Sequence, residues 1–224
     1  MKQRTERDLV LPLASTGLLM AFYLLARPYG DSPLVASTAD QRAAAFASVW
    51  WVLAHVAGAL ALASFARAAL RLADLARDDF TARLARWSGL AGAVLVLPYF
   101  GAETFALHAI GQRVLAGDAD LLTLVDEVRG NGVALAMFCI GLLLLAVSGI
   151  AFALAWTRWS GSRAAWPLGI AVALMLPQFY LPPVGRMAFG VAYLLAAGLL
   201  VTSILRRTAA ATPPLHTVPA TQAG

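Results

Sequence analysis

Two polar side chains, Glu103 and His55, lie inside long apolar runs of this 224-residue chain. Tryptophans near the ends of those runs serve as depth markers, because Trp favours membrane interfaces. Glu103 lies ~24 Å beyond Trp87, which is ~6 Å inside the far edge of a ~30 Å hydrocarbon core. His55 lies ~7 Å inside the same edge when measured from Trp50. We therefore expect both side chains at nearly one depth, in a polar pocket that opens outward.

Glu103 is the strongest candidate for chemistry. A carboxyl group in hydrocarbon is costly when it is charged and unpaired, so it must pair with a cation, face protein or keep its proton. The expected partners are His55, which would share a proton with it, and Arg186, which would keep it ionised. The alternative is structural: a buried polar pair can simply hold helices together, beside small residues such as Ala54 and Gly58.

Further polar side chains gather toward the same end of the apolar runs. Thr104 and His108 are one helical turn apart and share a face, and Gln112 follows after another turn. The predicted ligand-binding residues are Glu103, His55, Thr104, His108, Gln178, Tyr180 and Arg186. If the protein is an enzyme, Glu103 is the expected general acid and His55 its proton partner.

Neither a metal nor a cofactor is expected. A haem bound by His55 and His108 is disfavoured because the two differ in depth by roughly 9–10 Å. Glu103 and His108 are five residues apart, ~140° around a helix, which does not suit a metal site. Cys139 is the single cysteine, which excludes an intrachain disulfide and a cysteine-based zinc site. The sequence contains no P-loop, GxGxxG or GxSxG motif.

The composition explains why buried polar residues stand out. The chain is 60% hydrophobic and only 13% charged, against about 25% charged residues in ordinary soluble domains. The mean hydropathy of +0.74 indicates an integral membrane protein, because a soluble fold of this size could not bury so much apolar surface. The net charge is +5, but the basic residues form short blocks rather than a stripe, so no nucleic-acid partner is expected.

The elements that position these polar residues are six predicted transmembrane helices in an all-α, multi-pass fold. Their approximate ranges are 9–26, 44–66, 88–112, 132–156, 165–181 and 187–205. The first run is too long for a signal-peptide core and is interpreted as an uncleaved helix. Residues 1–207 are predicted to form one transmembrane domain, and the Ala/Thr/Pro-rich residues 208–224 a disordered cytoplasmic tail.

Charge distribution predicts the orientation. With the N-terminus inside, twelve Lys and Arg residues flank the inner helix ends and five flank the outer ends. Both termini are therefore expected in the cytoplasm, with the protein in the plasma membrane. The Arg-rich segment 67–86 is interpreted as a cytoplasmic extension of the second span, anchored on anionic lipid. Segment 113–131 is interpreted as a short amphipathic helix on the outer surface, a candidate lid.

An internal similarity indicates a tandem repeat of helical hairpins. Trp87 and Pro98 recur 79 residues later as Trp166 and Pro177, within similar local sequences. Duplication of a two-helix unit would explain this. The alternative is independent placement of an interfacial aromatic residue and a proline kink, since proline frees a carbonyl on the preceding turn.

Three functions remain open from the sequence. The first is a multi-pass protein that binds or moves a small or amphipathic ligand, such as a lipid or isoprenoid, in the outward-facing pocket. The second is a membrane enzyme that processes such a lipid with Glu103 as general acid. The third is a structural or assembly subunit. The expected partners are membrane lipids, a small-molecule or lipid ligand and a membrane partner subunit.

Overall fold

The apolar runs of the sequence form helices whose ends are set by polar caps. The computed structural model describes residues 5–34 and 36–210, and within these ranges it contains helices and no strand. Ser48 caps α3 (Val49–Leu75) by accepting a hydrogen bond from the backbone N–H of Trp50. Asp79 caps α4 (Phe80–Gly101) and Asn131 caps α7 (Gly132–Ser160) in the same way. Gly161, with φ +73°, ends α7.

Within the described residues, five helices are long and apolar enough to cross a membrane. They are Glu6–Ala26, Val49–Leu75, Phe80–Leu115, Gly132–Ser160 and Pro183–Ala210. The first comprises the short helix η1 (Glu6–Leu9) and α1 (Val10–Ala26), and the last is α9 (Pro183–Ala210). These helices support the prediction of an all-helical membrane protein.

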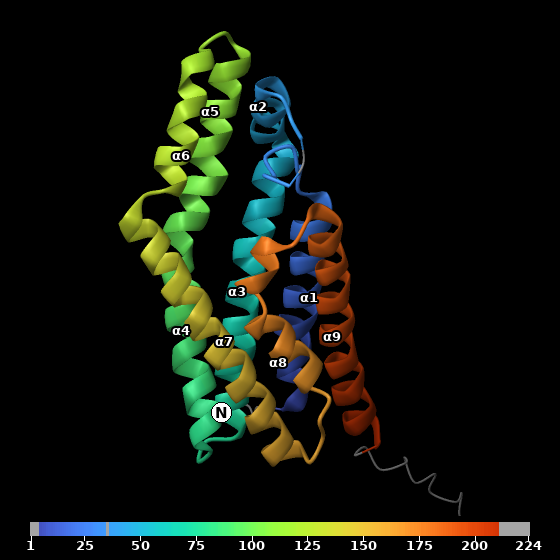
Figure 1. Ribbon diagram of the computed structural model, residues 1–224. Helices are drawn as coiled ribbons and strands as arrows, with labels where there is room; N and C mark the ends of the chain where they lie inside the picture. The colour runs from blue at the N-terminus through green and yellow to red at the C-terminus, as the bar shows by residue number, and fades with distance from the viewer. Residues whose placement is uncertain (1–4, 35, 211–224) are drawn as a thin grey trace, which may run out of the picture.

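The predicted span 165–181 is interrupted. It forms α8 (Trp166–Ala173) and the one-turn helix η4 (Pro177–Tyr180), separated by a turn. Pro177 has no N–H to continue the hydrogen-bond ladder of α8. The two pieces still rise from the lower end of the bundle toward the start of α9 (Figure 1). The described chain therefore begins and ends at the same end of the bundle (Figure 1).

The third long helix extends well beyond the bundle. α4 continues through a π-helical segment, η2 (Ala102–Ala106), into α5 (Leu107–Leu115), a total of 36 residues. At 1.5 Å per residue this is ~54 Å, against a ~30 Å hydrocarbon core. The upper part packs on α2 (Ala39–Ala47), and the chain returns through η3 (Ala119–Thr123) and α6 (Leu124–Arg129) (Figure 1).

Several predicted boundaries are wrong for local reasons. Residues 44–66 do not form one continuous helix, because Ser48 separates α2 from α3. Segment 67–86 is not one extension: α3 ends at Leu75 and α4 begins at Phe80. Segment 113–131 folds back as η3 and α6 along α5 rather than forming one separate helix (Figure 1).

Two other predictions concern the second half of the chain. The expected tail starts too early, since α9 includes residues 208–210, and the remainder, 211–224, lies outside the described residues. The tandem repeat stays a prediction. Pro98 lies inside a continuous α4, whereas Pro177 begins the one-turn helix η4, so the two similar sequences have different local structures.

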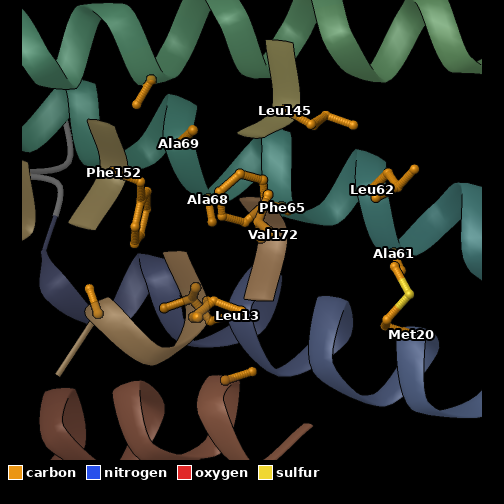
Figure 2. Packing of buried hydrophobic residues seen from close by; sticks show 14 of the residues in the cluster. Leu13, Met20, Ala61, Leu62, Phe65, Ala68, Ala69, Leu145, Phe152 and Val172 are labelled. Carbon is orange, nitrogen blue, oxygen red and sulfur yellow. The ribbon is translucent and has the colours of Figure 1, made fainter. Parts of the chain in front are cut away.

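Buried apolar side chains hold the bundle together. Figure 2 shows Leu13 and Met20 of α1 near Ala61 and Phe65 of α3, with Phe152 of α7 beside them. Small residues let helices approach closely. A Cβ atom added at Gly92 of α4 would lie 2.6 Å from the carbonyl oxygen of Gly141 in α7, so the α4–α7 crossing requires glycine.

Candidate functional site

A cavity of about 410 Å³ lies among the ends of several helices. This volume falls within the 300–1,000 Å³ typical of small-molecule sites. Four of the seven predicted ligand-binding residues line it, namely Glu103, His55, Tyr180 and Arg186. They come from η2, α3, η4 and α9, which are far apart in sequence. The fold therefore brings four of the seven predicted ligand-binding side chains to one cavity.

A chain of ion pairs forms one wall of the cavity. Arg129, the last residue of α6, donates from Nε to Oε1 of Glu103 (2.8 Å) and from Nη2 to Oε2 (3.1 Å). The same Nη2 also donates to Oδ2 of Asp31 (2.8 Å). Arg27 donates to that Asp31 oxygen from the other side (2.6 Å). The sequence predicted His55 or Arg186 as the partner of Glu103. In the structure the partner is Arg129 instead.

The charges of this wall stabilise one another. Burial alone would raise the pKa of Asp31, but the positive charges of Arg27 and Arg129 outweigh it, so the pKa lies below its ordinary value of 3.8. Burial alone would lower the pKa of Arg129, but the carboxylates of Glu103 and Asp31 raise it above its ordinary value. Asp31 and Arg129 are consequently both charged at neutral pH.

The π-helical segment explains how Glu103 is fixed. In an α-helix the N–H of Leu107 would bond to the carbonyl of Glu103, but here it bonds to the carbonyl of Ala102. The carbonyl of Glu103 instead accepts a hydrogen bond of 2.7 Å from the indole Nε1 of Trp51. This contact joins α3 to η2 at the same residue that pairs with Arg129. Trp51 itself is fully buried.

His55 is held in one orientation. Its Nδ1 lies 2.7 Å from the carbonyl oxygen of Trp51, and because a carbonyl only accepts, Nδ1 carries the hydrogen. In the neutral ring Nε2 is then an acceptor, and it has no hydrogen-bond partner within residues 5–34 and 36–210. The ring packs against Trp51 and Tyr23, with centroids 4.2 and 5.3 Å away. His55 is only 3% exposed and lines the cavity.

Arg186 is the third guanidinium of the cavity. It is 7% exposed, and its Nε lies 3.3 Å from Oε1 of Gln178. Its Cζ lies 5.4 Å from the ring centre of Tyr29 and 5.1 Å from that of Phe179. Its Nη2 has no hydrogen-bond partner among the described residues, and no described carboxylate lies within 4 Å.

Three predicted residues do not line the cavity. Thr104 is buried, and its hydroxyl donates to the carbonyl of Phe100 (2.5 Å) within its own helix. Nδ1 of His108 lies 2.8 Å from the carbonyl oxygen of Phe46 in α2, so His108 contributes to the contact between α5 and α2. Gln178 is buried behind Arg186 and contacts it directly.

Another part of the cavity lining is apolar and is called the apolar wall below. It includes Leu135 and Phe138 of α7 and Leu176 and Phe179 at the α8–η4 turn. In the described part of the chain, no group of three or more His, Cys, Asp or Glu side chains is placed to hold a metal ion. The cavity therefore combines a fixed charged wall with an apolar wall.

Sequence reasoning missed Arg27, Asp31 and Arg129 as site residues. Neither Arg27 nor Arg129 was among the predicted ligand-binding residues. A weak signal was present, because Arg27 and Asp31 have the four-residue spacing of an ion pair on a helix, although they lie just beyond α1. Arg129 is 26 residues from Glu103, so only the return of α6 along α5 brings them together.

Comparison of the chain with protein-family models, with curated proteins and with solved structures finds no match.

Proposed function

We propose that this protein binds or moves a small amphipathic ligand, such as a lipid or an isoprenoid, in the 410 Å³ cavity. One observation carries the proposal: a single cavity has an ion-paired wall, including Glu103 and Arg129, and an apolar wall, including Leu135 and Phe138. Ligand sites are typically apolar with a few placed polar groups. A ligand with a polar end and an apolar end would match both walls.

The proposed setting is the plasma membrane, with six crossings and both termini in the cytoplasm. The broken segment formed by α8 and η4 would supply the sixth crossing, and non-helical backbone is tolerated at membrane depth where protein surrounds it. The excess of Lys and Arg near the inner helix ends supports this orientation. The cavity would then open toward the outer face.

The rim of the cavity supports an apolar route of access. Four residues that line the cavity are also exposed, namely Leu34, Leu135, Tyr180 and Leu181. Exposed apolar side chains are stable where they face lipid tails. An amphipathic molecule could therefore reach the cavity from the bilayer as well as from water.

An enzyme acting on such a ligand is the second candidate function, and His55 favours it. Its unpartnered Nε2 is an acceptor that could take a proton from a bound ligand. Glu103 was the expected general acid, but both its carboxylate oxygens accept hydrogen bonds from Arg129. A general-acid role for Glu103 would first require this ion pair to open.

Native mass spectrometry of the gently purified protein tests the proposal. We expect a specific co-purifying amphiphile with wild-type protein and its loss in Leu135→Trp, which places an indole at the rim. Leu143→Trp is the matched control, because Leu143 is an exposed leucine of the same helix that does not line the cavity. A chemically altered ligand recovered after incubation would identify the enzyme instead.

The structural alternative makes a different prediction. If the polar residues only hold helices together, no specific molecule should co-purify, and Leu135→Trp should behave like Leu143→Trp in every ligand assay. That result would contradict ligand binding in this cavity.

A further inference from the structure

Arg186 has no carboxylate partner among the described residues, unlike the other two guanidiniums of the cavity. Arg27 pairs with Asp31, and Arg129 pairs with both Asp31 and Glu103. The cavity therefore carries three arginine charges against two carboxylate charges. The surplus positive charge belongs to Arg186, which is more than nine-tenths buried.

The surroundings of Arg186 favour the binding of an anion. A buried guanidinium is costly unless it is paired and hydrogen-bonded. The rings of Tyr29 and Phe179 offset part of this cost through cation–π contacts. They do not supply an acceptor, and Nη2 has none within the described ranges. Gln178 accepts only from Nε, at 3.3 Å.

Asp31 does not remove the surplus charge. Its Oδ2 already accepts hydrogen bonds from Arg27 and Arg129. Its Oδ1 is buried and has no described partner, but the carboxylate as a whole is flanked by two cations. The electrostatic balance of the cavity therefore favours an anionic ligand over a cationic one.

We propose that the ligand is an amphiphile with an anionic headgroup, a carboxylate or a phosphate monoester, that binds Arg186. This inference rests on the proposed function and names the chemical class of its ligand. Guanidinium suits both headgroups because its planar fork matches their oxygens. The chain of the ligand lies on the apolar wall that includes Phe138 and Leu176.

The cavity of about 410 Å³ has the size of a small-molecule site. We expect it to hold the headgroup and the first part of the chain, while the rest of the chain passes the apolar rim at Leu135 and Leu181.

A headgroup series on the wild-type protein in a neutral detergent tests the inference. The probes are oleate, oleyl phosphate and oleyl alcohol, which share one chain, and inorganic phosphate, which has none. We expect the two anionic amphiphiles to raise the unfolding temperature and to appear as one-to-one adducts by native mass spectrometry. Oleyl alcohol is expected to bind at least ~10-fold more weakly, since it leaves Arg186 unpaired.

Variants assign the effect to Arg186. Arg186→Gln should weaken oleate binding roughly 10- to 100-fold without changing the affinity for oleyl alcohol. Arg186→Lys should retain part of the affinity because it keeps the charge. Arg113→Gln is the control, because Arg113 is an exposed arginine outside the cavity. If Arg186→Gln does not fold, the wild-type headgroup series and Arg186→Lys still test whether an anionic headgroup binds Arg186.

The outcomes separate this inference from the function on which it rests. Equal binding of oleyl alcohol and oleate overturns the anionic headgroup but keeps amphiphile binding. Binding of inorganic phosphate as tight as that of oleyl phosphate indicates a site for a small anion and overturns the amphiphile. No binding of any probe, together with no co-purifying molecule, overturns both.

Discussion

Arg129 donates two hydrogen bonds to the carboxylate of Glu103, although the two residues lie 26 positions apart and on different helices. Paired hydrogen bonds between a guanidinium and a carboxylate fix geometry as well as charge. This contact ties the end of α6 to the π-helical segment η2. The Arg129–Glu103 pair therefore fixes the position of the charged wall relative to the helix bundle.

The energetic coupling of this pair can be measured by a double-mutant cycle. We expect Glu103→Gln and Arg129→Gln each to lower the free energy of unfolding, because each leaves a charged partner partly buried. The coupling energy should be about 1–3 kcal/mol, since the two side chains are 14% and 26% exposed. The measurement is reversible unfolding of detergent-solubilised protein.

The surface pair of Arg113 and Asp118 provides the control cycle. Its side chains are 68% and 45% exposed, so its coupling should not exceed about 1 kcal/mol. Purely additive effects of Glu103→Gln and Arg129→Gln would contradict a direct stabilising contact between them.

Trp51→Phe should destabilise the protein by removing the hydrogen bond to the carbonyl of Glu103. The loss of one buried hydrogen bond costs about 1–3 kcal/mol when it leaves an acceptor unsatisfied, and the smaller ring adds a packing defect. Trp50→Phe is the matched control, because Trp50 is the neighbouring residue and is half-exposed. It should change stability by no more than about 0.5 kcal/mol. Equal effects in thermal unfolding would show that the contact with Glu103 does not matter.

Asp31 should make the protein sensitive to acid. Its pKa in the folded protein lies below its ordinary value of 3.8, because Arg27 and Arg129 outweigh the effect of burial. Asp31 therefore stabilises the fold fully above pH 3.8 and loses this contribution as the pH falls through its folded-state pKa. The stability difference between wild type and Asp31→Asn, followed by unfolding from pH 7 downward, should shrink below pH 3.8.

Arg27→Gln supplies the second arm of the pH experiment. Removing this cation takes away the largest influence that lowers the pKa of Asp31, so the acid loss should begin at a higher pH. An unchanged acid profile in Arg27→Gln would contradict the electrostatic role assigned to Arg27.

The proposed orientation can be tested with single cysteines in a Cys139→Ala background. Asp118 lies between α5 and η3, and Ser162 lies between α7 and α8, at opposite ends of the bundle (Figure 1). We expect Asp118→Cys to react with an impermeant maleimide added outside cells, and Ser162→Cys only after the membrane is opened. The reverse pattern would overturn the orientation.

The regular rise of a helix predicted His55 and Glu103 at nearly one depth. Both residues line one cavity, as their equal depths suggested. Depth alone does not identify the partner of Glu103, because it says nothing about which neighbouring helix faces the carboxylate. Glu103 also lies in a π-helical segment, where the rise per residue differs from that of an ordinary α-helix.

The sequence by itself determined the class of the protein and most of its long helices, because apolar length and polar caps are local properties. α1 and α7 begin within one residue of their predicted positions. Only the tertiary structure showed which residues form the charged wall of the cavity. Arg27, Asp31 and Arg129 come from loops and a helix end, and their meeting depends on how α6 returns along α5 and how α1 ends beside α3. The contacts of Arg129 with Asp31 and Glu103 join residues 98 and 26 positions apart, so no local pattern encodes them.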